Sequence, residues 1–222
     1  MKLLFICMFH QIGEGKYANH FETFKKQIEY FERIGHFTLP GKPLAKGYNF
    51  CLTFDDATYD FYEIIYPFLK EKKISALLAV PIDLIENPPN EQRKYCNFEE
   101  LEEMVQSPYV EIASHSMSHI NLLKAENLEY EIVHSKKVLE EKLKTTITSF
   151  VYPYGKMNRN IQKIVEKEYL YAFRIGTSIN FSWTSLLYRI PCDNLQSIDK
   201  TTSLKKVFLY IFNFFKNKVR GR

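Results

Sequence analysis

Short apolar runs alternate with helical patterns along most of this 222-residue chain. The runs are rich in aromatic and branched residues, as buried strands are, and they cover 3–9, 50–54, 75–80, 110–114, 148–152, 169–175 and 186–191. Strands separated by helices usually pair in parallel, with each helix crossing over one face of the sheet. The alternation therefore predicts a single α/β domain built on a parallel sheet.

The segments between the runs predict helices and two longer loops. Apolar residues recur at helical spacing in 21–34, from about Tyr59 onward with a possible bend at Pro67, and in 98–104, 125–144 and 161–165. The segment 35–47 contains two prolines and three glycines, which predicts a loop. The irregular segment 82–97 is either a lid over a groove or surface chain, and the sequence leaves both open.

Composition and cysteine usage limit the class of protein. With 45% hydrophobic and 15% aromatic residues, the chain can bury a sizeable core. The formal charge of +4 is too small to indicate a nucleic-acid partner. The four cysteines lack CxxC spacing and lie mostly in apolar runs, which favours buried thiols in a reducing compartment over a disulfide framework.

The first residues and the hydropathy pattern predict a cytoplasmic location. The apolar run in 1–13 is followed by no small-residue cleavage site, so it is interpreted as a first core strand rather than a signal peptide. No apolar run is long enough to span a bilayer.

Two adjacent carboxylates, Asp55 and Asp56, follow the apolar run 50–54. Two negative charges at the rim of a core are costly unless a cation or strong hydrogen bonds compensate them. The simpler alternative is that Asp56 caps a helix beginning near Tyr59.

A second polar pair follows the strand-like residues 110–114. His115 and His119 are four residues apart, so in a helical turn they would share one face and could hold one ion together. The alternative is an exposed helical pair without a ligand. One aspartate and two histidines suit a divalent ion such as Zn²⁺ with an open coordination position, and Co²⁺, Ni²⁺ or Mn²⁺ would fit a similar geometry.

Three motifs in this order resemble the polysaccharide deacetylases, carbohydrate esterase family four. They are Thr53-Phe54-Asp55-Asp56, His115-Ser116-Met117-Ser118-His119 and Tyr152-Pro153-Tyr154-Gly155. The resemblance runs from about Asn49 to Gly155. It implies an irregular (β/α)7 barrel with Asp55 as catalytic base and with Asp56, His115 and His119 as metal ligands. It also implies that the backbone N–H of Tyr154 stabilises the oxyanion, although Tyr154 could simply line the groove.

The chain departs from this family pattern at two positions. Val151 stands where many members carry an arginine that supports the base, and no histidine follows position 134 to act as the late general acid. His10, at the end of the first predicted strand, is the candidate acid, although a loop histidine bonded to backbone is the plainer interpretation. Arg174 is the candidate partner for Asp55, or equally the partner of a surface acid.

The segment 203–222 is treated as a basic amphipathic helix and tail beyond a catalytic domain of residues 1–202. It holds six basic and no acidic residues. Its first part is expected to be the last helix of the barrel, and a basic aromatic-rich helix can also contact an anionic membrane. In that case a lipid-linked substrate at the inner face of the membrane would be plausible.

These features together predict a metal-dependent N-deacetylase. The expected substrate is an acetamido sugar of a glycan or glycolipid in the assembly of a bacterial polysaccharide or lipopolysaccharide. One alternative is removal of another acyl group, such as formyl, from a lipid-linked sugar. The other is a carbohydrate-binding protein with impaired catalysis, which the missing late histidine and Val151 favour.

Overall fold

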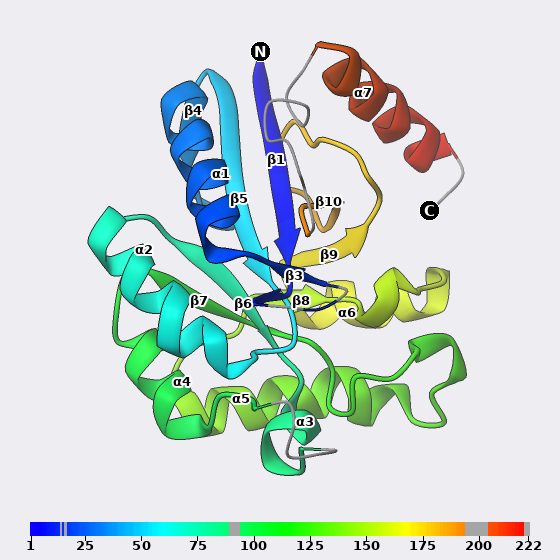
Figure 1. The fold of residues 1–222 in the computed structure, drawn as a ribbon. Helices are drawn as coiled ribbons and strands as arrows, with labels where there is room; N and C mark the ends of the chain where they lie inside the picture. Colours follow the sequence, from blue (N-terminus) through cyan, green and yellow to red (C-terminus); the bar gives the residue numbers. More distant parts are fainter. Residues whose placement is uncertain (14, 16, 89–93, 194–203, 220–222) are drawn as a thin grey trace.

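The computed structural model describes residues 1–13, 15, 17–88, 94–193 and 204–219. Its centre is a closed barrel of parallel strands, because β1 pairs with both β10 and β5 (Figure 1). The barrel strands are β1 (Lys2–Phe9), β5 (Gly47–Phe54), β6 (Ala76–Val80), β7 (Val110–Ser114), β8 (Ser149–Val151), β9 (Tyr171–Ile175) and β10 (Leu186–Pro191). The predicted parallel α/β fold and its seven-stranded barrel are therefore confirmed.

The barrel is irregular because its strand pairs differ in length. The pair β1–β5 runs in register from Lys2 opposite Gly47 to Phe9 opposite Phe54. By contrast, β1 meets β10 only at Cys7↔Ile190 and Met8↔Pro191. The longer of these pairs contains β5, the strand that ends directly before Asp55 and Asp56.

Side chains alternate between an inner and an outer core, as parallel strands require. Every barrel strand contributes to the inner cluster, which consists of Leu4, Ile6, Cys51, Leu77, Ala79, Ala113, Val151, Phe173 and Leu187. The residues between them, such as Phe5, Phe50 and Phe150, pack outward against the helices. This alternation decides which residues at the strand ends face into the barrel.

The helices cover the outside of the barrel. They are α1 (Phe21–Ile34), α2 (Tyr66–Lys72), α3 (Ile82–Glu86), α4 (Phe98–Val105), α5 (Ser135–Leu143), α6 (Arg159–Glu168) and α7 (Leu204–Val219). Four short helical segments accompany them, η1 (Phe61–Ile65), η2 (Leu122–Lys124), η3 (Tyr130–His134) and η4 (Pro153–Gly155). The wide π turn η1 ends two residues before Pro67, whose missing N–H cannot continue an α-helical ladder, so the helix is irregular where a bend was predicted.

Three predicted segments differ from the structure. The segment 35–47 is not all loop, because β4 (Gly35–Phe37) pairs with the start of β5. The irregular segment 82–97 begins with the short helix α3. The helix predicted over 125–144 is preceded by η2 and contains the π turn η3, so its regular part is shorter.

Two short strands, β2 (Gln11–Ile12) and β3 (Ala18–Asn19), form a separate small sheet after β1. All four cysteines are free and buried, as predicted. None of the helices within the described residues is long and apolar enough to cross a membrane.

Candidate active site

All six predicted site residues line one cavity at the carboxyl ends of the barrel strands. The cavity has a volume of about 620 Å³, and the residues are His10, Asp55, Asp56, His115, His119 and Tyr154. They follow the ends of four strands, β1, β5, β7 and β8, where parallel barrels place their binding sites. The sequence-based grouping of these residues therefore agrees with their positions in space.

Asp56 lies between the two histidines of the second motif. Its Oδ1 is 3.3 Å from Nε2 of His119 and 3.7 Å from Nε2 of His115. The backbone of Asp56 is left-handed, with φ of 72°, which turns its side chain away from the strand direction of Asp55. Asp56 does not cap the following helix, because Asp60 occupies the N-cap position of η1.

The histidine segment is a loop and not the helical turn that the spacing suggested. Ser116 and His119 have left-handed backbones, with φ of 67° and 50°, which a helix excludes. The Oγ of Ser116 accepts a hydrogen bond from the N–H of His119 at 3.0 Å, so this buried serine closes the turn. The two imidazole rings nevertheless meet, with centroids 4.7 Å apart.

Two acidic side chains outside the motifs hold this loop. Glu131, which is buried, accepts a hydrogen bond from the N–H of Ser118 at 3.0 Å. The hydroxyl of Ser118 donates to Asp83 at 2.6 Å. These contacts come from η3 and α3, so neighbouring helices fix the loop that carries both histidines.

The surroundings of His115 favour a neutral imidazole whose Nε2 can bind a metal ion. Its Nδ1 lies 2.7 Å from the carbonyl oxygen of Val151, to which the ring N–H donates. Burial lowers the pKa of His115 to about 4, despite the opposing attraction of Asp55. A neutral imidazole with Nδ1 protonated leaves Nε2 directed at the ligand cluster.

The chemistry of this donor set fits a divalent metal ion. The ligand atoms of Asp56, His115 and His119 all lie within 4.8 Å of one another. Ligands at about 2.0–2.2 Å from a tetrahedral zinc ion are roughly 3.4 Å apart, close to the measured separations from Asp56. Three protein ligands leave one position open, as in catalytic zinc sites.

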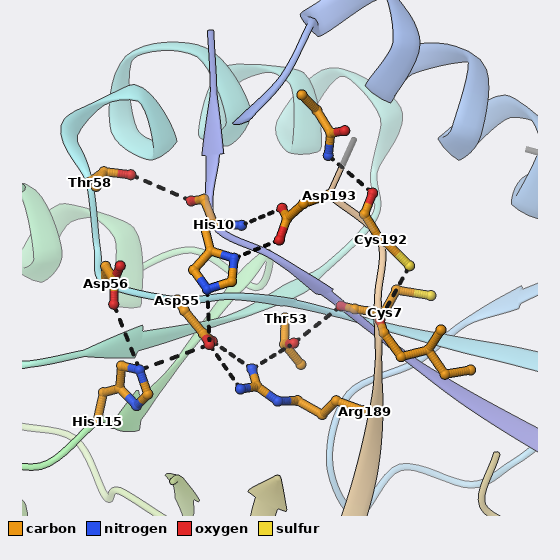
Figure 2. Close-up of polar contacts among 12 residues, drawn as sticks. Cys7, His10, Thr53, Asp55, Asp56, Thr58, His115, Arg189, Cys192 and Asp193 are labelled. Carbon is orange, nitrogen blue, oxygen red and sulfur yellow. Dashed lines mark hydrogen bonds and ion pairs between the residues drawn. The ribbon is translucent and has the colours of Figure 1, made fainter. Parts of the chain in front are cut away.

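Asp55 forms a two-point ion pair with Arg189 inside the barrel (Figure 2). Nη1 is 2.5 Å from Oδ1, Nη2 is 2.8 Å from Oδ2, and both side chains are buried. Burial alone would raise the pKa of Asp55, but the charge and hydrogen bonds of Arg189, together with His115, hold it well below its usual value. Asp55 is therefore an ionised carboxylate at neutral pH.

The prediction that Arg174 would neutralise Asp55 is wrong. Phe173 belongs to the inner cluster, so its neighbour Arg174 faces the outer layer. Leu187 also belongs to the inner cluster, and two residues on, Arg189 faces inward on the same strand. Strand alternation within the segment 186–191 was the sequence signal that could have identified Arg189.

His10 pairs with a residue that the sequence analysis missed. Its Nδ1 is 2.7 Å from Oδ2 of Asp193, whose Oδ1 also accepts from the His10 N–H at 3.1 Å (Figure 2). Its Nε2 is 3.9 Å from Oδ2 of Asp55. Burial lowers the pKa of His10, but the Asp193 hydrogen bond and the charge of Asp55 outweigh it, so the net shift is upward.

Tyr154 lines the cavity next to His119. Its ring centroid is 4.9 Å from that of His119, and the residue is 58% exposed. Its left-handed backbone, with φ of 56°, is followed by Gly155 with φ of 64°. A Cβ at Gly155 would meet the backbone N of Ile175 at 3.2 Å, so the turn needs glycine there.

Comparison with known proteins identifies the family. The model of the family described as "Polysaccharide deacetylase" matches residues 46–172, which include all three motifs. The chain belongs to the polysaccharide deacetylase family. Among curated proteins, YxkH of Bacillus subtilis (strain 168) is 28% identical over 177 residues. That match covers 73% of this chain but 60% of YxkH, so the chain spans about three-fifths of the length of this relative.

Solved structures share the fold, and one of them is a deacetylase. The Streptococcus pyogenes deacetylase PplD superposes with a TM-score of 0.77 at 22% identity, covering 94% of this chain and 98% of PplD. IcaB from Ammonifex degensii gives a TM-score of 0.76 at 21% identity, covering 87% of this chain and 93% of IcaB. This family member therefore has the same barrel fold as PplD and IcaB.

Proposed function

We propose that this protein is a metal-dependent hydrolase that removes the N-acetyl group from an acetamido sugar of a glycan or glycolipid. The observation that carries the proposal is the cluster of Asp56, His115 and His119 beside Asp55 and His10 in one cavity. Family membership supports the same chemistry. A cytoplasmic location and a role in bacterial polysaccharide or lipopolysaccharide assembly belong to the proposal.

Asp56, His115 and His119 would hold the divalent ion, for which Zn²⁺ is the first choice. A metal ion in such a site lowers the pKa of a bound water molecule and polarises the acyl carbonyl. Asp55 is then the base that accepts the proton of the attacking water. Its pair with Arg189 keeps the carboxylate ionised and fixes its direction toward the cavity.

His10 would return a proton to the sugar nitrogen as the C–N bond breaks. The pKa of His10 is raised by Asp193 and Asp55, which stabilises the protonated ring, whereas the pKa of Asp55 is depressed. Groups whose pKa values are pushed apart in one site are suited to separate acid and base roles. Asp193 holds the His10 ring through Nδ1, which leaves Nε2 on the side of Asp55.

The tetrahedral intermediate carries an oxyanion that needs a hydrogen-bond donor. The backbone N–H of Tyr154 is proposed for this role by its place in the third motif. The left-handed conformation of Tyr154 on the cavity wall supports the assignment, because non-glycine residues are held there only by their surroundings.

The pair of His10 and Asp193 also bears on the alternative of a binding protein without catalysis. The late family histidine is absent, but a histidine held by a carboxylate lines the same cavity. Similarly, Arg189 supplies a guanidinium to Asp55 although Val151 replaces the family arginine. Both substitutes favour an enzyme.

A panel of N-acylated sugars tests the proposal. The metal-loaded protein is incubated with N-acetyl and N-formyl sugars in free, nucleotide-linked and lipid-linked forms, and the released acid is measured. Release of acetate that is lost in Asp55→Asn supports the deacetylase. Faster release of formate would favour the deformylase alternative. Binding of sugar without release of either acid would favour the binding protein.

A further inference from the structure

The helix α7 is seated firmly on the barrel by one of its faces. Val207 and Tyr210 are buried, and the ring of Phe214 lies 5.0 Å from that of Phe181. Asn213 and Asn217 donate from their side-chain amides to the carbonyl oxygens of Thr177 and Gly176 at 2.9 and 3.1 Å, respectively. The orientation of α7 about its own axis is therefore fixed by packing and hydrogen bonds.

The opposite face of α7 exposes large apolar side chains. Phe208, Phe212 and Phe215 are 69%, 64% and 58% exposed, and Leu209 is 45% exposed. The phenylalanines recur at intervals of four and three residues, and Leu209 lies three residues before Phe212, so all four share one side of the helix. Within the described residues, all of the exposed phenylalanines in the structure lie on this helix. Packing against the barrel cannot account for them, because the barrel takes up the other face.

Lysines flank this apolar face, and no acidic residue interrupts it. Lys205 and Lys206 lie at the start of α7 and are exposed, and Lys216 and Lys218 lie near its end and are exposed. By helical spacing, Lys205 and Lys216 fall on the same side as the exposed phenylalanines. The sequence from 203 to 222 contains six basic residues and no aspartate or glutamate.

We propose that the exposed face of α7 binds the surface of an anionic lipid bilayer. The phenylalanines and Leu209 enter the boundary between headgroups and acyl chains, and the flanking lysines contact the anionic headgroups. A second copy of the chain would fit less well, because pairing two such faces brings two sets of lysines together. Charge complementarity thus selects an anionic surface as the occupant.

The position of α7 relates this surface to the cavity. The carbonyl groups that hold Asn213 and Asn217 belong to the residues directly after Ile175, and Ile175 lines the cavity. A membrane bound to α7 would therefore be connected, through Gly176 and Thr177, to a chain segment that lines the cavity. Figure 1 shows α7 on the other side of β1 from α1. The membrane proposal does not depend on the reaction in the cavity.

Vesicle sedimentation tests the proposal without an activity assay. The full chain is mixed with vesicles of phosphatidylcholine alone or with a third of phosphatidylglycerol, and the bound fraction is measured by sedimentation. We expect binding to the anionic vesicles that falls with added salt and is weakened at least tenfold by Phe208→Ser/Phe212→Ser/Phe215→Ser. A matched control, Leu123→Ser/Leu170→Ser, changes exposed apolar residues elsewhere and should leave binding unchanged.

Three results would overturn the proposal. They are no binding to anionic vesicles, equal binding to both kinds of vesicle, and binding that the triple serine variant retains. Sedimentation velocity without lipid provides the second measurement. A dimer that the same triple variant dissociates would assign the apolar face to a second copy of the chain instead.

Discussion

Arg189 on β10 and Asp55 after β5 form a buried two-point ion pair across the barrel. The two hydrogen bonds measure 2.5 and 2.8 Å, and Nη1 of Arg189 also donates to Oγ1 of Thr53 at 3.3 Å. The pair joins two strands that are not neighbours in the sheet. It therefore links the stability of the barrel to the charge state of the proposed base.

Replacing Arg189 by methionine should destabilise the protein and impair catalysis together. The substitution leaves the buried Asp55 carboxylate without its cation, which typically costs about 3–5 kcal/mol. Urea unfolding at pH 7 measures the loss. Arg159→Met, at an exposed position at the start of α6, is the matched control and should cost less than about 1 kcal/mol. Equal effects of the two substitutions would contradict the assigned pair.

Asp193→Asn should change the pH dependence of the reaction. His10 has to be protonated to act as the acid, so activity is present below its pKa and falls as the pH rises through it. Asp193 contributes to raising that pKa, so its neutralisation should move the alkaline limb of kcat/KM to lower pH. The acid limb should stay in place. An alkaline limb that does not move would show that His10 is not the titrating acid.

Removing the metal should abolish activity and lower thermal stability. Oδ1 of Asp56 lies close to Nε2 of both His115 and His119, so one ion would contact all three side chains in the folded protein. An ion that binds only the folded protein stabilises it by mass action. Calorimetry before and after dialysis against a chelator measures the change, and added Zn²⁺ should restore it. A melting temperature that is the same with and without Zn²⁺ would argue against the ligand set.

Glu131→Ala should weaken metal binding without touching a ligand. Glu131 holds the histidine loop through the N–H of Ser118, and loss of such an outer contact usually costs about 10–100-fold in affinity. Titration calorimetry with Zn²⁺ measures it. Glu129→Ala, exposed on the same helical segment, is the control. If both variants bind the ion equally, the loop is held by other contacts.

Much of the fold could be predicted because strands and helices in this chain have strong local patterns. The apolar runs matched the barrel strands, and the residues that follow them reached one cavity because all barrel strands are parallel. The short strand β4 was missed because its three residues, beginning at Gly35, gain their pairing from β5 and not from their own propensity.

The parts of the site that sequence analysis missed depend on distant contacts. Asp55 and Arg189 are 134 residues apart, and His10 and Asp193 are 183 apart. No local pattern specifies such pairs, although strand alternation could have favoured Arg189 over Arg174. The histidine turn was misjudged because spacing alone cannot reveal the left-handed backbones of Ser116 and His119, which contacts with neighbouring helices support.

The most direct test of the central claim is acetate release from an N-acetylated sugar by the Zn²⁺-loaded protein. Wild type is compared with Asp55→Asn, with His115→Ala and with Glu129→Ala as the control. The proposed mechanism predicts release by wild type and by the control, and at least a hundredfold loss in the other two, since each removes the base or a metal ligand. Undiminished release by Asp55→Asn would contradict the proposed mechanism.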